Sequence, residues 1–323
     1  MAALLRLIVA MGLLLGAAVA PAQDARRVVV GFPPGGTLDV LGRAVAQVAA
    51  ESAGGTWLVD NQPGAGSLLA AQNVARAKAD GQTLLLAPVV VPAFMPHLYK
   101  KLAFDPLADL VPVAELGAFN FALVVGAQVP VKTLAEWVAY CKANPGKTSF
   151  GSFGAGTPSH FVGVMFNRAA STDTLHLPYK GGAPAMQALL AGEVQAAYLL
   201  TGGMTTEQAK TGKVRVLAVT GAARSRSLPE VPTFAESNLG LKEMEAASLW
   251  YGWFAPKGTL PAEVDKLNRL LVQAAGSPKV LEVMAREEIV PNAGSAAAFA
   301  QKVQRDHRQW GEVIRATGFT LEQ

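Results

Sequence analysis

Short apolar runs alternate along the chain with segments whose apolar residues recur at helical spacing. Residues 27–32 form a β-branched run, and after a Pro-Gly turn apolar residues at positions 40–48 recur every three or four places. The alternation continues with a strand at 56–60, a helix at 67–78 and a strand at 82–87. Because parallel strands need crossover connections, usually helices, this order predicts a doubly wound, mostly parallel sheet.

The rhythm restarts in the middle of the chain. An apolar strand is expected at 116–125, and Thr133 and Glu136 form a capping box that opens a helix ending at Lys142. Further strands and helices are then predicted at 147–150, 158–168, 174–177, 183–191, 194–200 and 214–220. The pattern therefore predicts a second α/β unit.

Three helices are predicted in the C-terminal tail, and we expect them to pack on the first unit. They cover residues 261–274, 278–287, with Ser277 as N-cap, and 295–317. We expect the chain to cross between units near Phe119 and to return within residues 250–255. The predicted domains are residues 23–119 with 253–323, and residues 120–252.

The first 22 residues are typical of a secretory signal peptide. Arg6 precedes an apolar run at 7–19, and small residues follow at Ala20 and Ala22. A membrane anchor is the alternative, but the run is shorter than the roughly 20 residues that a spanning helix needs. We expect cleavage after Ala22 and a periplasmic protein.

Composition excludes several classes of protein. The chain is 51% hydrophobic and 16% charged, which excludes intrinsic disorder, and a formal charge of +4 is too small to indicate nucleic-acid binding. The single cysteine, Cys141, excludes an internal disulfide and a cysteine metal cluster; its helical apolar context predicts a buried side chain. The four histidines lack metal-ligand spacing, so we expect no metal and no cofactor.

Two glycine-rich loops, each between a predicted strand and a predicted helix, are the candidate binding elements. The first covers residues 31–39, and its glycines and helix N-terminus favour an anion, although a simple tight turn is equally compatible. The second covers residues 150–160, with Thr157 as expected N-cap and Pro158 at the first helical position. If the units face each other, the two helix ends suit a carboxylate or dicarboxylate held between them.

Catalysis has weak support. His160 lies beside Ser159 and near Ser152, which leaves a serine hydrolase as an alternative, but no third catalytic member is evident. Glu287 and Glu288 are expected to be solvated rather than a catalytic pair.

Eight ordered segments resemble the Bug-type extracytoplasmic solute receptors, the substrate-binding components of tripartite tricarboxylate transporters. They are VVVGFPPGGTLDVLGRAVAQ (28–47), VDNQPGAGS (59–67), ADGQTLLLA (79–87), LYKKLAFDPLADLVPVAEL (98–116), FGSFGAGTPSHFVGVMF (150–166), LPYKGGAPAMQALLAGEV (177–194), GKVRVLAVTGAARSRSLPEVPTFAES (212–237) and WYGWFAPKGTL (250–260). The resemblance implies a two-domain periplasmic-binding-protein fold of type II that closes on a small carboxylate without making or breaking bonds.

The resemblance also implies the binding residues. In the first loop these are Phe32, Gly35, Gly36, Thr37, Leu38 and Asp39. In the second loop they are Ser152, Ala155, Gly156, Thr157, Ser159 and His160. Tyr179 and Gly181 belong to a third stretch, in which Lys180 is open between a structural role and a ligand contact.

Departures from the family pattern indicate an apolar site. Leu38 and Ala155 stand where the family has small polar residues and asparagine. Further replacements are Val91, Pro92, Met95, Tyr198, Leu199 and Leu200. Since a site lacking polar partners rejects groups that need them, we expect a ligand with one carboxylate and an apolar or aromatic remainder.

The expected partner is the membrane permease of a tripartite tricarboxylate transporter. The alternative is a two-component sensor kinase, to which a receptor would present the same carboxylate. A monomer is the expected state.

Overall fold

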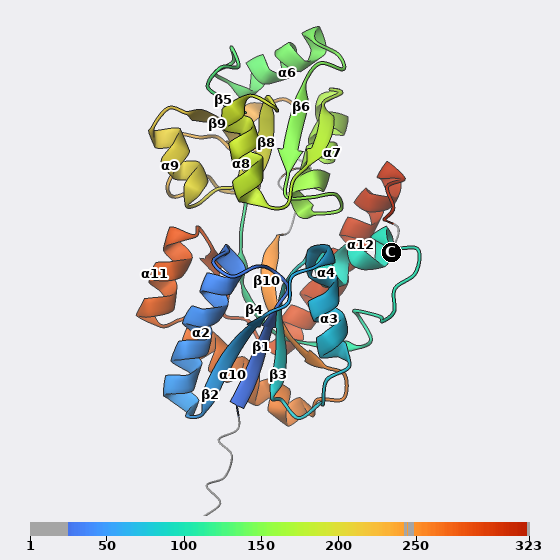
Figure 1. Ribbon diagram of the computed structural model, residues 1–323, viewed down its shortest axis with the longest axis vertical. Coiled ribbons are helices and arrows are strands. Elements are labelled where there is room, and N and C mark those ends of the chain that lie inside the picture. The colour runs from blue at the N-terminus through green and yellow to red at the C-terminus, as the bar shows by residue number, and fades with distance from the viewer. Residues whose placement is uncertain (1–24, 242–243, 245–248, 322–323) are drawn as a thin grey trace, which may run out of the picture.

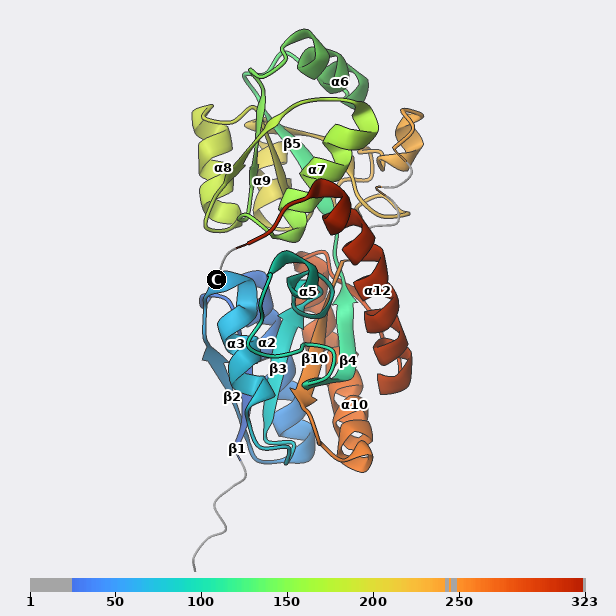
Figure 2. The ribbon, with the colours of Figure 1, turned by 90° about the vertical axis from the view of Figure 1, so that its right-hand side faces the viewer.

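The computed structural model describes residues 25–241, 244 and 249–321, so the predicted signal peptide lies outside the described residues. Figure 1 shows two α/β units stacked along the long axis of the molecule. We call the unit that contains the N-terminal strand the first unit and the other the second unit. Figure 2 shows the C-terminal helix running along the first unit and reaching the second.

The sheet of the first unit has six strands. Its order is β11 (Val290–Pro291), β4 (Leu110–Ala118), β10 (Trp250–Pro256), β3 (Thr83–Pro88), β1 (Ala25–Val30) and β2 (Thr56–Asn61). Strand β1 pairs parallel with β2 and β3, whereas β10 is antiparallel to both β3 and β4. Strands β1 to β4 therefore run in one direction.

The sheet of the second unit repeats this plan with five strands. Its order is β7 (Leu175–Pro178), β6 (Ser149–Ser152), β8 (Ala196–Leu200), β5 (Phe121–Gly126) and β9 (Val214–Val219). Only β5 is reversed, being antiparallel to β8 and β9. Each sheet is thus mostly parallel in direction, and the type II fold expected from the sequence is present.

Apart from the two-residue edge strand β11, which is also antiparallel to β4, the reversed strands are the ones that enter each sheet from the other unit. Strand β5 follows directly on the crossing at 119–120, and β10 follows the return. Phe119 N–H donates to the Leu249 carbonyl at 3.1 Å, so the two connecting segments lie side by side. Both strands start at the junction, where the parallel strands end, and so they run the opposite way.

Two details of the sequence prediction are wrong. The apolar run at 116–125 is not one strand, because it is divided at the crossing between β4 and β5. The return comes before Trp250, which pairs with Ala118 in the first sheet, and not at the 252/253 boundary. Continuous hydrophobicity hides such a break, because both strands are buried.

Helices cover the faces of the sheets. In the first unit they are α2 (Thr37–Ala53), α3 (Leu68–Ala75), α4 (Val90–Ala93), α5 (Met95–Leu98), α10 (Pro261–Ala275), α11 (Pro278–Arg286) and α12 (Ala296–Thr317). In the second unit they are α6 (Leu134–Ala143), α7 (Pro158–Ala170), α8 (Gly182–Ala191) and α9 (Met204–Lys210). The described residues also include two 3-10 turns, η1 (Ala65–Ser67) and η2 (Ala235–Ser237).

The tail helices pack on the first unit as predicted, with α10 and α12 against β4 and α11 against α2. Two predicted caps are confirmed, since Thr133 accepts from the Glu136 N–H at 3.2 Å and Ser277 accepts from the Val280 N–H at 3.4 Å. Cys141 is buried, and burial raises the pKa of its thiol to about 11. The Cys141 side chain therefore packs in the core as an unreactive thiol, and its predicted burial is confirmed.

The apolar core continues across the junction. One cluster of buried side chains includes strands of the first unit and residues of α7 in the second. The Phe94 and Phe161 rings, one from each unit, lie 5.7 Å apart. Within the part of the chain described, no helix is long and apolar enough to cross a membrane.

Candidate ligand-binding site

Both glycine loops lie at the junction between the units. The first connects β1 to α2 and the second connects β6 to α7, so each follows the carboxyl end of a strand that points toward the other unit (Figure 1). In open α/β sheets this edge is where ligands bind, because the strands end there and helices begin. The sequence prediction that the two loops come together is compatible with this arrangement.

The first loop is held on its buried side by Asp39, whose side chain is almost fully buried. Its carboxylate accepts hydrogen bonds from the Gly35 N–H, the Arg43 Nε and the Asn61 Nδ2, each at 2.9 Å. Burial alone would raise the pKa of the Asp39 carboxyl, but these hydrogen bonds lower it below its ordinary value. The carboxylate therefore braces the loop, and its oxygens are occupied by the protein itself.

The upper side of the first loop carries the exposed residues 33–36. Gly36 has an extended backbone at the start of α2, and among the described residues no side chain caps this helix. Leu38 is buried in the core and Phe32 is half-buried against it. Thr37, the first helical residue, donates its hydroxyl to Glu287 Oε2 at 2.8 Å.

The second loop is cross-linked by its own hydroxyl groups. Ser152 is fully buried; its Oγ accepts from the Gly154 N–H at 3.1 Å and lies 2.6 Å from His176 Nε2. Thr157 is the N-cap residue of α7, as predicted, but its hydroxyl donates to the Gly154 carbonyl at 2.7 Å and makes no capping hydrogen bond to the helix. The loop conformation is therefore fixed by contacts within the second unit.

Ser159 and His160 also face inward. The Ser159 Oγ accepts from the Phe153 N–H at 2.9 Å, and His160 Nδ1 accepts from the Gly156 N–H at 3.2 Å. Because Nδ1 is an acceptor, the proton of the neutral His160 ring is on Nε2.

A pair of stacked histidines lies beneath the second loop, a feature that sequence reasoning missed. The His160 and His176 rings are parallel within 15° and 3.9 Å apart. Burial lowers the pKa of His160 to about 3, with a further contribution from His176, and lowers that of His176 to about 4. Both rings are neutral at physiological pH, so this loop keeps no positive side chain beneath it.

The third stretch follows β7. Tyr179 packs its ring on Gly151, and its hydroxyl lies 3.5 Å from Glu193 Oε2. Lys180 and Ala155 are exposed, whereas Gly181 adopts a φ of +113° at the start of α8. Since only glycine adopts such a φ easily, Gly181 sets the direction in which α8 begins.

The replacements expected to make the site apolar lie mostly in the core, which corrects that part of the sequence argument. Val91 and Met95 are 0% and 1% exposed, and Tyr198 is buried against Phe150 and Phe166. Pro92 and Leu199 are buried as well, and Leu200 alone among these residues is partly exposed. These residues are close in sequence to segments that lie at the junction, but most of their side chains are buried in the core.

Glu287 and Glu288, expected to be solvated, are instead at the junction. The Glu288 carboxylate accepts from the Ser225 Oγ and the Ser227 N–H, both at 2.7 Å, and thus joins the two units. Burial would raise the pKa of Glu288, but the hydrogen bonds from Ser225, Ser227 and Thr201 lower it below its ordinary value. A contact between residues about 60 positions apart has no local sequence signal.

The C-terminal segment also spans the junction, opposite these glutamates. The Leu321 N–H donates to the Leu98 carbonyl at 2.8 Å, and the Leu321 side chain lies over Gly156. Phe319 meets the His160 ring edge-on at 4.8 Å. The second loop is therefore covered by the end of the chain.

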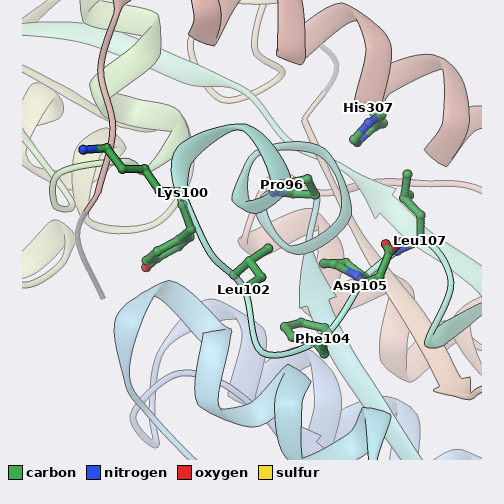
Figure 3. Close-up of a pocket in the computed structure, with 9 residues that line it drawn as sticks. Pro96, Lys100, Leu102, Phe104, Asp105, Leu107 and His307 are labelled. Atoms are coloured by element: carbon green, nitrogen blue, oxygen red, sulfur yellow. The ribbon is translucent and has the colours of Figure 1, made fainter.

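A surface groove of about 390 Å³ lies in the first unit, between the segment at 96–107 and α12 (Figure 3). It is lined by Pro96, Tyr99, Lys100, Leu102, Phe104, Asp105, Pro106, Leu107 and His307. None of the candidate site residues from the sequence lines this groove. Among the described residues, no group of histidine, cysteine and carboxylate side chains has the arrangement of a metal site.

The paired α/β units and the binding elements at the ends of their parallel strands define a periplasmic-binding-protein fold of type II. The chain matches the family described as "Tripartite tricarboxylate transporter family receptor" over residues 41–319. It belongs to this family, whose members are solute-binding receptors and not enzymes.

Individual relatives agree. Protein BugT of Bordetella pertussis is 34% identical over 297 residues, which cover 92% of this chain and 90% of BugT. The structure of the periplasmic binding protein BugD is similar with a TM-score of 0.82 at 33% identity, over 93% of this chain and 99% of BugD. Rpa4515 of R. palustris, solved with adipate, has a TM-score of 0.83 at 27% identity, over 93% and 99% of the two chains.

The serine hydrolase alternative fails on geometry as well. Ser159 Oγ and His160 Nδ1 are each engaged by a backbone N–H of the loop rather than by each other. The Ser152 and His176 pair is close, but Ser152 is 0% exposed and cannot meet a substrate.

Proposed function

We propose that this protein is a periplasmic receptor that captures a small carboxylate between its two units and delivers it to the membrane permease of a tripartite tricarboxylate transporter. Cleavage of the predicted signal peptide after Ala22 would release the mature chain into the periplasm. The observation that carries the proposal is the position of both glycine loops, each opening a helix, at the junction of a fold shared with known receptors of this family.

A carboxylate suits this junction because helices begin there in both units. The first turns of α2, α7 and α8 follow strand ends at the junction, and the backbone N–H groups of a first helical turn lack intrahelical partners. Such N–H groups, together with the helix dipole, favour an anion. The adipate found with Rpa4515 is a ligand of this chemical type.

The ligand we propose has one carboxylate and an apolar or aromatic remainder. The hydroxyls of Ser152, Thr157 and Ser159 are already hydrogen-bonded within the second loop. What the two loops still offer are backbone groups and the half-buried rings of Phe32 and Phe153. A ligand with many polar groups would lose hydrogen bonds to water that these surfaces do not replace.

Binding would act by shifting the equilibrium between open and closed arrangements. A ligand that contacts loops on both units binds the closed form more tightly, and that differential affinity stabilises the closed form. The segments at 119–120 and 249–250 connect the units and are the expected hinge. The permease would then recognise the closed receptor.

A thermal-shift screen of the ligand-stripped mature chain tests this proposal. Hexanoate and benzoate should raise the melting temperature, and a ligand at about 100 times its dissociation constant adds roughly 2.7 kcal/mol to the free energy of unfolding. Hexanamide, which has the same chain length without the charge, is the matched control and should give no shift.

Two results would contradict the proposal. If citrate or a free amino acid binds most tightly, the ligand class is wrong although the receptor function stands. If no carboxylate shifts the melting temperature, the proposed capture of carboxylates is wrong.

A further inference from the structure

The two glycine loops differ in whether an acidic side chain of the protein is hydrogen-bonded at the helix that follows. At the start of α2, the Thr37 hydroxyl donates to the Glu287 carboxylate at 2.8 Å, although the two residues are 250 positions apart. We infer that Glu287 is a specificity-determining residue, whose negative charge excludes a second ligand carboxylate from the first loop. This inference rests on the proposed function and names the residue that would limit the ligand to one carboxylate.

Glu287 is held in place by both units. Its N–H donates to the Val283 carbonyl at 3.0 Å at the end of α11, in the first unit. Gly202 of the second unit packs so closely that a Cβ there would come within 2.8 Å of the Glu287 carbonyl carbon. The neighbouring Glu288 is hydrogen-bonded to Ser225 and Ser227. The Glu287 backbone therefore cannot withdraw from Thr37 without separating the units.

The groups around Glu287 do not neutralise the negative charge of its carboxylate. Arg286 Nε is 3.7 Å from the Glu287 carboxylate, but this guanidinium is 65% exposed and its charge is screened by water. The residue also caps the carboxyl end of α11, where the helix dipole is negative. The adjacent Tyr251 is buried and stays neutral, because burial and the Glu287 charge both raise its pKa.

The positive end of α2 is thus partly satisfied by the protein's own carboxylate. No comparable acidic side chain is hydrogen-bonded at the start of α7 or α8 among the residues described. A ligand with one carboxylate can place it at the second unit and turn its apolar part toward the first. A dicarboxylate would bring its second charge toward Glu287, and the repulsion would lower its affinity.

Isothermal titration of hexanoate and adipate tests the inference, because the two probes share a six-carbon chain and differ by one carboxylate. The wild-type protein should bind hexanoate more tightly than adipate. Glu287→Gln keeps the size of the side chain and removes its charge, so it should raise adipate affinity at least tenfold and change hexanoate affinity less than threefold.

Glu282→Gln is the matched control. Glu282 is exposed on the same helix, and its replacement changes the net charge equally without touching Thr37. It should leave both affinities within twofold of the wild type. A melting temperature for each variant shows that the fold is retained.

The possible results distinguish failure of the specificity role of Glu287 from failure of the proposed receptor function. If hexanoate binds but Glu287→Gln leaves the ratio of the two affinities unchanged, Glu287 is not the specificity residue and the receptor function stands. If Glu287→Gln instead weakens hexanoate binding, Glu287 is a favourable contact and the inference is overturned. If neither probe binds any variant, the proposed function fails and the inference with it.

Discussion

The first and second glycine loops share a strand, loop and helix plan, but they are stabilised in opposite ways. In the first loop, residues 33–36 are exposed and one buried carboxylate, that of Asp39, holds the backbone from below. In the second loop, Ser152, Ser159 and His160 are buried and fill the loop from within. Similar sequence patterns thus produce a first loop with an exposed backbone and a second loop filled by its own side chains.

The contrast between the two loops bears on how polar residues in a glycine-rich motif are interpreted. A serine or histidine next to glycines suggests a ligand contact, yet here these side chains satisfy backbone N–H groups of their own loop. Buried N–H groups need such partners. The atoms left for a ligand are then backbone atoms and exposed residues, and not the conspicuous hydroxyls.

We expect the greatest loss of stability on acidification, because of the two buried histidines that support the second loop. His160 and His176 have folded-state pKa values of about 3 and about 4, below the ordinary value of 6.5. Between pH 6.5 and 4 the unfolded chain therefore binds more protons, and stability falls as the pH falls. From pH 7.5 to 5 each ring should cost about 2 kcal/mol and the two together about 4 kcal/mol, since one pKa unit corresponds to about 1.4 kcal/mol.

Urea unfolding at the two pH values measures this effect. His176→Gln keeps a polar partner for Ser152 and should remove roughly half of the acid loss. Asp39 and Glu288 have lowered pKa values, so their contributions are lost as the pH falls below the ordinary values of 3.8 and 4.5 and change little between pH 7.5 and 5. An unchanged acid loss in the variant would contradict the role assigned to the histidine pair.

The next effect concerns the brace of the first loop. Asp39→Ala removes the buried carboxylate that accepts from Gly35, Arg43 and Asn61, and should lower the free energy of unfolding by about 2 kcal/mol. It should also weaken hexanoate binding, because the loop at residues 33–36 loses its fixed conformation. Urea unfolding and titration measure the two effects.

Glu51→Ala is the control for that change, since Glu51 is an exposed acidic residue near the far end of α2. Its effect on stability should stay within about 0.5 kcal/mol, as for most surface substitutions. Equal effects of the two substitutions would show that the loop does not depend on Asp39.

The smallest effect compares equivalent glycines of the two loops. Gly35 and Gly156 have φ values of +84° and +77°, so alanine strains either backbone by about 1 kcal/mol. An added Cβ at Gly35 meets no described atom within 4 Å, but at Gly156 it lies 2.7 Å from Leu321 Cδ1. Gly156→Ala should therefore cost about 1 kcal/mol more than Gly35→Ala, within the range of overpacking.

Thermal unfolding of the two variants provides the measurement. Replacing Leu321 by alanine in the Gly156→Ala background should restore part of the loss, because it removes the atom that the new Cβ meets. Equal costs for the two glycine variants would mean that the C-terminal segment does not restrain the second loop.

Much of the fold was predictable because its signals are local. Strand runs, helical periodicity and the caps at Thr133 and Ser277 depend on residues only a few positions apart, and the structure confirms them. The division between β4 and β5 was not predictable from apolarity, since both strands are buried. Helix α9 was missed because its residues, Met204–Lys210, carry no apolar periodicity.

The positions of the two glycine loops at strand ends were predictable, but the directions of their side chains were not. Two α/β units, the tail helices and two glycine loops at strand ends follow from local sequence signals, namely periodicity and the conformations open to glycine. The directions of side chains depend on tertiary packing, which turns Leu38 and Val91 into the core, Ser159 into its own loop, and Glu287 onto Thr37. The reason is physical, since contacts between residues 250 positions apart form only when packing brings their elements together, and no local pattern encodes that meeting.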